Sequence, residues 1–248
     1  MISGRAERCL EGRTALVTGA SRGIGRAVAG ALAAAGANAV VTAWDTDGVT
    51  DAVAGLRKPG AHAADCAGSV GDPEHLGRCT ELAMREFGRL DILVNNAATN
   101  ATYGPLMEAD PGVAPRVHGE HGGGVVAGAA RLAGLDARAR RRGGRHLHRG
   151  HPRGGPNVGA YGTSKAALLH LTRQLAGELA PGVRVNAVST GLVRTEIARF
   201  AWEGAEWTAR AASSGSPIRP SGRPSAMRWG VSGLFDRTRP EIYQFAGA

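Results

Sequence analysis

The chain is poor in aromatic residues and has no long apolar run, and the second shortage excludes a membrane-spanning protein. Phe, Trp and Tyr make up 4% of the 248 residues. No apolar run approaches the roughly 18 residues that a membrane span needs. Residues 1–12 also lack the apolar core of a secretion signal. We therefore expect a cytoplasmic protein that does not enter a membrane.

Cysteine is also scarce. The three cysteines are Cys9, Cys66 and Cys79, an odd number whose spacing matches no metal-binding or redox motif. Reduced thiols in a cytoplasmic protein are the simplest account of them. We therefore predict no metal site.

The net charge of +9 suggests nucleic acid as a partner, but the location of the charge argues against one. Residues 111–155 contain nine arginines, no lysine and two acidic residues, so they contribute +7 and the rest of the chain carries +2. No aromatic residue lies among these arginines, so the stacking surface of a single-strand binder is missing. We expect no nucleic-acid partner.

A glycine-rich loop, Thr18–Gly25, follows an apolar stretch and leads into a helical pattern at 26–35. The first turn of a helix leaves backbone N–H groups unpaired, and these can bind a phosphate. Gly19 permits the tight turn, Gly23 lets the backbone approach a pyrophosphate, and Gly25 lets the helix pack on the strand. The spacing is G-x-x-x-G-x-G, so by itself the motif is also compatible with a plain turn between a strand and a helix.

The pattern along the chain is one of strand–helix units, which indicate a parallel sheet with right-handed crossovers. The length suits one α/β domain with a sizeable core. Strands are expected at 14–18, 39–42, 61–65, 91–94 and 183–188, and helices at 26–35, 49–56, 72–87 and 159–179.

Three further motifs follow the glycine loop in order. Residues 90–98 are an apolar run that ends in Asn-Asn-Ala, Tyr161 and Lys165 lie four positions apart in a helical pattern, and 183–188 lead into Gly191–Thr195. Together the four motifs resemble the short-chain dehydrogenase/reductase family, in particular its ketoacyl-reductase-like and carbonyl-reductase-like members. The resemblance covers about residues 10–110 and 156–200. It implies a Rossmann-like, doubly wound parallel sheet in a single domain over residues 1–248.

The resemblance implies a catalytic pair. Tyr161 would give a proton to the carbonyl oxygen of the substrate while a hydride arrives from nicotinamide. Lys165 shares one helical face with it and would lower the pKa of its phenol while binding the nicotinamide ribose. A surface Tyr/Lys pair on an ordinary helix is the alternative for this motif taken alone.

The resemblance also implies a set of cofactor contacts. The pyrophosphate would lie on the glycine loop, adenine against the end of the third strand, the adenine ribose after the fourth strand, and the carboxamide after the strand at 183–188. Asn96 would brace the sheet. The residues carried over are Gly19, Ser21, Arg22, Gly23, Ile24, Gly25, Asp65, Asn95, Ala97, Tyr161, Lys165, Val193 and Thr195.

The residue at the end of the second strand decides between the two nicotinamide cofactors, because an acidic side chain there binds the ribose 2′-hydroxyl and repels a 2′-phosphate. In register this residue is Ala43, and Arg22 in the loop offers a cation to a 2′-phosphate. NADP(H) is therefore favoured. Asp45 keeps NAD(H) open, since a shifted strand end would bring it to the ribose.

Two stretches, 111–155 and 208–248, depart from the family pattern. In the first, 31 of 45 residues are Gly, Ala, Arg or Pro and five are His, although it should supply a long helix and the central fifth strand. The second lacks the signatures that bracket the last strand of the family, so the fifth strand and the C-terminal strand are both in doubt. We interpret both stretches as reading-frame shifts in a G+C-rich gene. An unusual natural insertion is the alternative.

The first departure removes two of the four catalytic positions of the family. The expected serine, thirteen residues before Tyr161, coincides with His148, and the expected asparagine falls within His118–His121. A histidine at 146 or 148 is a possible substitute for the serine hydroxyl, which polarises the substrate carbonyl.

Two functions follow from the resemblance. The first is an NADP(H)-dependent oxidoreductase that interconverts a ketone and a secondary alcohol, acting on a 3-ketoacyl or small carbonyl substrate. The second is a catalytically impaired or partly misfolded member that lacks the serine and the asparagine. The family implies a homo-oligomer, which the two departing stretches leave in doubt because they supply its interfaces.

Overall fold

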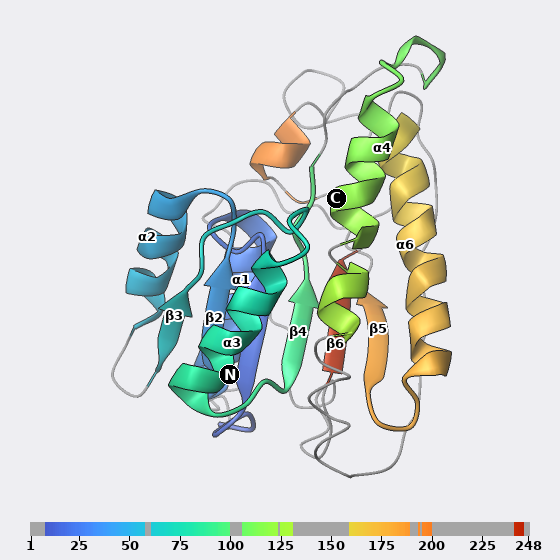
Figure 1. Cartoon of the computed structure of the whole chain (residues 1–248). Coiled ribbons are helices and arrows are strands. Elements are labelled where there is room, and N and C mark those ends of the chain that lie inside the picture. Colours follow the sequence, from blue (N-terminus) through green and yellow to red (C-terminus); the bar gives the residue numbers. More distant parts are fainter. Residues whose placement is uncertain are drawn as a thin grey trace, which may run out of the picture.

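A single parallel sheet of six strands organises the part of the chain that the computed structural model describes. This part comprises residues 8–57, 61–99, 106–123, 125–130, 159–188, 193, 195–199 and 241–245. The strand order is β3-β2-β1-β4-β6-β5, and every neighbouring pair is parallel (Figure 1). The strands are β1 (Thr14–Thr18), β2 (Asn38–Thr42), β3 (Ala63–Asp65), β4 (Ile92–Asn95), β5 (Arg184–Val188) and β6 (Glu241–Phe245).

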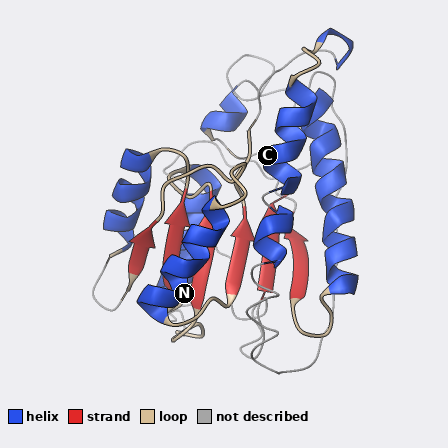
Figure 2. Ribbon diagram, viewed as in Figure 1, coloured by secondary structure: helices blue, strands red, loops and turns tan. Residues whose placement is uncertain are grey.

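Helices connect these strands and cover the sheet (Figure 2). The α-helices are α1 (Gly23–Ala34), α2 (Thr46–Leu56), α3 (His75–Phe87), α4 (Val113–His118) and α6 (Gly159–Glu178), with short helical turns at η1 (Leu106–Glu108), η2 (Gly119–Gly123) and η3 (Glu196–Ala198). Residues 125–130 are helical as well. None of the helices in the described ranges is long and apolar enough to cross a membrane.

Successive residues of the central strand β1 serve two separate cores. Val17 packs with α1 and α2 residues such as Leu32 and Val49 on one face of the sheet. Leu16 packs on the other face with α3 and α6 residues such as Leu76 and Leu168. All five residues of β1 are buried, as expected of a parallel strand covered on both faces. The predicted doubly wound α/β fold is confirmed.

The local predictions were accurate, and the boundaries differ for identifiable reasons. The strand at 14–18 has the predicted bounds. The helix predicted at 26–35 begins earlier, at Gly23, because its first turn is part of the glycine loop itself. The helix predicted from residue 72 begins at His75, since the Asp72 carboxylate accepts the Glu74 N–H at 2.9 Å in a preceding turn. That helix ends before Gly88, which adopts a left-handed φ of 72°.

The family pattern assigns the central fifth strand to residues 111–155, and the doubt about that strand is justified, because no described residue of this stretch is in the sheet. Within this stretch residues 113–123 and 125–130 are helical, and 131–155 lie outside the described residues. The strand between β4 and β5 is β6, which comes from the other departing stretch, 208–248. Its Glu241 lies opposite Ile92 of β4 on one side and opposite Arg184 of β5 on the other. The segment Glu241–Phe245 contains the strand-forming residues Ile, Tyr and Phe, which residues 111–155 lack entirely.

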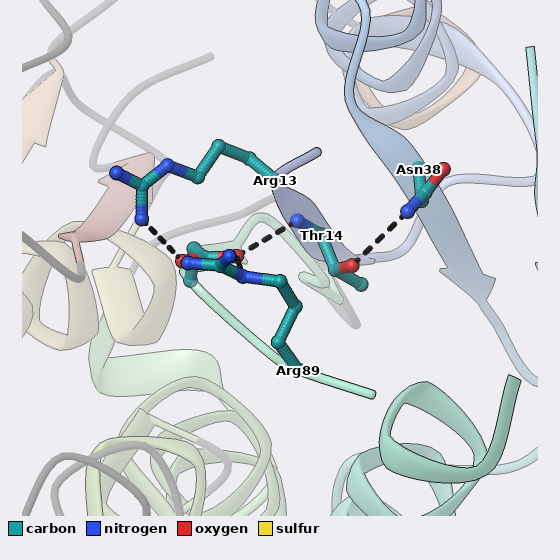
Figure 3. Close-up of polar contacts among 5 residues, drawn as sticks. Arg13, Thr14, Asn38 and Arg89 are labelled. Carbon is teal, nitrogen blue, oxygen red and sulfur yellow. Dashed lines mark hydrogen bonds and ion pairs between the residues drawn. The ribbon is translucent and has the colours of Figure 1, made fainter. Parts of the chain in front are cut away.

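A buried carboxylate holds the amino ends of the central strands together. Asp91, directly before β4, accepts hydrogen bonds from the Arg13 guanidinium at 2.6 Å, from the Arg89 guanidinium at 2.5 and 2.7 Å and from the Thr14 N–H at 2.9 Å. The Asn38 amide of β2 donates to the Thr14 hydroxyl at 3.4 Å, and Figure 3 shows this contact and the two arginines that converge on the carboxylate. This polar network therefore connects β1, β2 and β4 at the edge opposite the glycine loop.

Candidate active site

The carboxyl ends of β1 and β4 lie side by side, where the order of the sheet reverses. In open α/β sheets ligands bind at this point. The Thr18 hydroxyl accepts the backbone N–H groups of Asn96 and Ala97, both at 3.0 Å. The Asn96 amide donates to the carbonyls of Thr18 at 2.9 Å and Gly19 at 3.1 Å. The predicted role of Asn96 as a brace is confirmed, because it joins the two strand ends that form the crevice.

Two glycines of the loop are required by close contacts. Gly19 has φ +62°, and a Cβ on it would lie 2.7 Å from the Ala97 Cα. A Cβ on Gly25 would lie 2.5 Å from the Asn96 amide nitrogen and would overlap the Gly19 carbonyl oxygen. Both positions therefore exclude a larger residue, and the loop, α1 and the end of β4 form one closely packed unit.

The N-terminus of α1 suits an anionic ligand. Its N-cap residue, Arg22, is extended and makes no side-chain cap hydrogen bond, and the first turn contains no acidic residue. The first-turn N–H groups are therefore not capped by the N-cap side chain and not opposed by a carboxylate, as a pyrophosphate requires. A Cβ on Gly23 would lie 3.5 Å from the Thr195 Cγ2, so the segment after β5 packs against this loop. The donor set fits the dinucleotide of the resemblance, held by the backbone of residues 21–25.

The other residues assigned to the cofactor lie in different environments. Asp65 ends β3 and is exposed, and Val193 is half-buried. Asn95 is buried at 6% exposure, and a Cβ on Gly128 would lie 3.5 Å from its Oδ1. Its amide nitrogen has no hydrogen-bond partner among the described residues. The contacts assigned to these side chains stay predictions.

Tyr161 and Lys165 lie on one face of the first turns of α6, as predicted. The Lys165 Nζ is 5.1 Å from the centroid of the Tyr161 ring. A third side chain, His121, meets this ring edge-on, with centroids 5.7 Å apart and an interplanar angle of 87°. His121 belongs to the π-helical turn η2 after α4 and is buried, with 3% exposure. It occupies one of the four positions at which the resemblance places the catalytic asparagine.

A chain of hydrogen bonds fixes the state of His121. The Thr99 backbone N–H donates to its Nε2 at 3.0 Å, so we assign the ring proton to Nδ1. Nδ1 lies 2.7 Å from the Ser164 hydroxyl, which donates in turn to the Tyr161 carbonyl at 2.7 Å. The imidazole therefore links the segment after β4 to the first turn of α6.

Burial controls the acidity of this cluster. It lowers the pKa of His121 to about 3, with smaller contributions from the charges of Lys165 and His118, so the ring is neutral. Burial raises the pKa of Tyr161 to about 12 and lowers the pKa of Lys165 to about 8. The expected lowering of the Tyr161 pKa is not found in this structure, because desolvation of the phenol raises this pKa.

Two residues of the cluster were not predicted as site residues. Ser164 is one of the unspecified positions inside the Tyr-x-x-x-Lys motif, and its place three residues after Tyr161 was the available signal. His121 was considered only as an occupant of the asparagine position. His146 and His148, considered as substitutes for the catalytic serine, lie outside the described residues.

Comparison with known proteins identifies relatives over most of the chain. Residues 19–235 match the family model described as Enoyl-(Acyl carrier protein) reductase. The chain is 36% identical over 200 residues to Dehydrogenase/reductase SDR family member 4 of Sus scrofa, covering 78% of this chain and 70% of the relative.

Solved structures agree with this assignment. A protein from Sinorhizobium meliloti classed as a short-chain alcohol dehydrogenase superposes with a TM-score of 0.78 at 31% identity, covering 98% of this chain and 97% of that one. A short chain dehydrogenase from Burkholderia cenocepacia in complex with NADP gives 0.70 at 25% identity, covering 95% and 97% of the two chains. Sequence, doubly wound sheet and glycine loop lead to one conclusion: the chain belongs to the short-chain dehydrogenase/reductase family.

Proposed function

We propose that this protein is an NADP(H)-dependent oxidoreductase that interconverts a ketone and a secondary alcohol, with a 3-ketoacyl or small carbonyl compound as substrate. The observation that carries the proposal is the pairing of the half-buried Tyr161 with the buried Lys165, whose Nζ is 5.1 Å from the ring centroid. Hydrogen bonds run from the Tyr161 carbonyl through Ser164 and His121 to Thr99, which lies in the segment after β4.

The side chains have distinct roles in the proposed reaction. With a pKa of about 12, Tyr161 holds its phenolic proton at neutral pH and is in the correct state to protonate a carbonyl oxygen. Lys165, with a pKa of about 8, still carries its charge near pH 7 and stabilises the phenolate left behind. The nicotinamide cofactor, when bound, supplies or accepts the hydride. One hydride and one proton convert the ketone to the alcohol.

The preference for NADP(H) rests on charges near the glycine loop. Arg22 is exposed at the N-cap of α1, where its guanidinium can reach a 2′-phosphate. β2 ends at Thr42 and is followed by the buried Ala43, so the position that would repel a 2′-phosphate is not acidic. The NADP complex of the Burkholderia cenocepacia relative also supports this choice.

Turnover with a panel of β-ketoacyl esters and simple ketones tests the proposal directly. NADPH oxidation by the full chain should depend on Tyr161, and Tyr161→Phe should lower kcat by about 10²–10⁴, the usual contribution of a positioned acid. Thr163→Ala, an exposed position in the same helical turn, is the matched control and should retain activity. Equal rates for the wild-type and Tyr161→Phe chains would overturn the assignment of the acid.

The alternative of a catalytically impaired family member is supported by one observation. A neutral imidazole, His121, stands among the positions where the family carries an asparagine amide. In that case the chain would bind NADPH but reduce none of the β-ketoacyl esters and ketones. A change in nicotinamide fluorescence would detect the binding. Binding without turnover would therefore select this alternative over the proposed reductase.

Cofactor preference is testable at Asp45. A Cβ on Gly48 would lie 3.1 Å from both the Asp45 Cγ and the Ser21 Cβ, so this carboxylate lies near the glycine loop. Asp45→Asn should raise kcat/KM for NADPH relative to NADH by about fivefold to tenfold. The reason is that it removes roughly 1 kcal/mol of repulsion between the Asp45 carboxylate and the 2′-phosphate of NADPH near solvent. Asp47→Asn, exposed in the first turn of α2, should leave the ratio unchanged. A wild-type preference for NADH would contradict the proposed cofactor.

A further inference from the structure

Two thiols and an imidazole meet between the end of β3 and the start of α3, away from Tyr161. Cys66, His75 and Cys79 each place one donor atom so that all three lie within 4.8 Å of one another. Cys79 and His75 are buried, and Cys66 is half-buried. The proposed oxidoreductase chemistry uses none of these side chains.

The fold brings these residues together through two local arrangements. Cys66 directly follows β3, and its backbone N–H donates to the Val41 carbonyl at 3.0 Å, which extends the ladder beyond the strand. His75 and Cys79 lie four residues apart on α3, so they share one face of that helix. Packing of α3 on the sheet therefore forms a three-ligand set that the sequence spacing, Cys-x8-His-x3-Cys, did not suggest.

The imidazole of His75 is held in place but is only partly satisfied. Its side chain has 0% exposure, and Nε2 lies 2.6 Å from the Thr42 hydroxyl and 3.4 Å from the Cys79 sulfur. Nδ1 has no hydrogen-bond partner among the described residues. A Cβ on Gly68 would overlap the ring, so only glycine leaves room for it. The ring is therefore held with Nε2 towards the Cys79 sulfur, the orientation that a shared set of ligands needs.

We propose that Cys66, His75 and Cys79 bind one thiophilic divalent metal ion and that this ion is Zn²⁺. Two thiolates and one imidazole are ligands that Zn²⁺ prefers, with Zn–S distances near 2.3 Å and Zn–N distances of about 2.0–2.1 Å. Two thiolates also neutralise the charge of the ion, so the buried complex carries no net charge. Ligation through Nε2, which already faces the Cys79 sulfur, would use the nitrogen that points into the cluster.

The surroundings are compatible with a cation. The charge of Arg78 acts on both Cys66 and His75, but Arg78 pairs with Asp72 at 2.7 Å and with Glu74 at 4.0 Å, so this charge is compensated. The partly exposed Cys66 gives the ion a path from solvent. Three protein ligands leave a fourth position for water. The metal would join the end of β3 to α3 and so support the edge of the sheet that carries Asp65.

Cobalt substitution tests the site on the full-length, reduced chain. Titration with Co²⁺ should produce thiolate-to-cobalt charge-transfer absorption that saturates at one ion per chain, and Zn²⁺ should abolish it. Cys66→Ser and Cys79→Ser should each weaken Co²⁺ binding by about 100-fold or more, since each removes a direct ligand. Cys9→Ser, which changes the one cysteine outside the cluster, is the matched control and should bind as the wild type does.

Three outcomes would overturn the proposal. The first is no charge-transfer band in the folded wild-type chain. The second is a band that survives in both cluster variants. The third is a Cys66–Cys79 disulfide that persists after treatment with a reductant, detected as a chain mass two hydrogens below that of the fully reduced chain. Circular dichroism identifies any variant that fails to fold. If the buried Cys79→Ser chain unfolds, the comparison of Cys66→Ser with Cys9→Ser decides, because Cys66 is half-exposed.

Discussion

His121 connects three parts of the site through a single neutral ring. Its Nε2 accepts the Thr99 N–H, its Nδ1 donates to Ser164, and its ring lies edge-on to Tyr161. Protonation of Nε2 would put two N–H donors face to face, in addition to placing a charge in a buried site near Lys165. The ring can therefore act as a positioning residue for Tyr161 only while it is neutral.

This neutrality makes stability depend on pH with a definite sign. The unfolded chain protonates this imidazole as the pH falls below 6.5, whereas the folded protein resists protonation until about pH 3. The stabilisation is complete above pH 6.5 and is lost progressively as the pH falls from 6.5 towards 3. Between pH 7 and pH 4 the wild type should lose about 2–4 kcal/mol more of its free energy of unfolding than His121→Asn. Urea unfolding at a series of pH values measures this difference.

His62→Asn is the matched control for this experiment, because it makes the same replacement at an exposed histidine. Some acid sensitivity should remain in His121→Asn, since burial and the charge of Arg78 also lower the pKa of His75. Parallel curves for the wild type and His121→Asn would contradict a buried neutral His121. At neutral pH the variant should be less stable by about 1–2 kcal/mol, because Asn fills less of the site.

At the scale of elements, the Asp91 network holds the amino ends of the strands whose carboxyl ends form the crevice. Asp91 is 5% exposed and accepts hydrogen bonds from Arg13, Arg89 and the Thr14 N–H. The Arg89 side chain is 48% exposed, so water partly screens its ion pair with Asp91. This pair therefore contributes less to the free energy of unfolding than its short distances suggest. The Thr14 bond joins β1 and β4 directly.

Asp91→Asn should lower the free energy of unfolding by about 2–3 kcal/mol, because it removes charge-assisted bonds from a buried acceptor. Glu86→Gln changes an exposed carboxylate paired with Arg85 at 3.1 Å and should change stability by no more than about 0.5 kcal/mol. Thermal and urea unfolding of the two variants measure the contrast. Equal losses would mean that the Asp91 network contributes no more than a surface ion pair.

The elements that the sequence predicted well are those with local signals. The strand at 14–18 is a continuous apolar run, and the glycine loop and the Tyr161–Lys165 pair depend on spacings of a few residues. Partners far apart in the sequence were missed. Ser164 lies 43 positions from His121, and the metal-ligand set forms only when α3 packs beside β3. The acidity of Tyr161 was predicted with the wrong sign because its burial is a property of the tertiary structure.

At the scale of the whole molecule, the sheet is continuous only because of its last strand. β6 pairs with β4 on one side and with β5 on the other, from Ile92↔Glu241 to Val188↔Phe245. No described segment of 111–155 takes this position, although the family pattern assigns the central strand to that stretch. Within the sheet, β5 is therefore joined to the glycine-loop half only through the five residues of β6 (Figure 1), while α6, with Tyr161 and Lys165, also contacts that half through the core that contains Leu16.

A chain ending at Pro240 should lose this connection, whereas a chain ending at Phe245 should keep it. Without β6, the ladder groups of β4 and β5 lack their partner, and the exposed sheet edges favour association between molecules. The shorter chain should lose most of the 5–15 kcal/mol that typically stabilises a domain. Circular dichroism melts and size-exclusion chromatography should show a broad transition and aggregates for the chain ending at Pro240, and a cooperative, monodisperse protein for the chain ending at Phe245. If both truncated chains melt within a few degrees of the full chain, β6 does not hold the two halves of the sheet together.

NADPH binding by the shorter chain shows which half of the sheet is damaged. Retention of binding would locate the damage in the β5–α6 half, since the glycine loop depends on β1, β4 and α1 for its contacts.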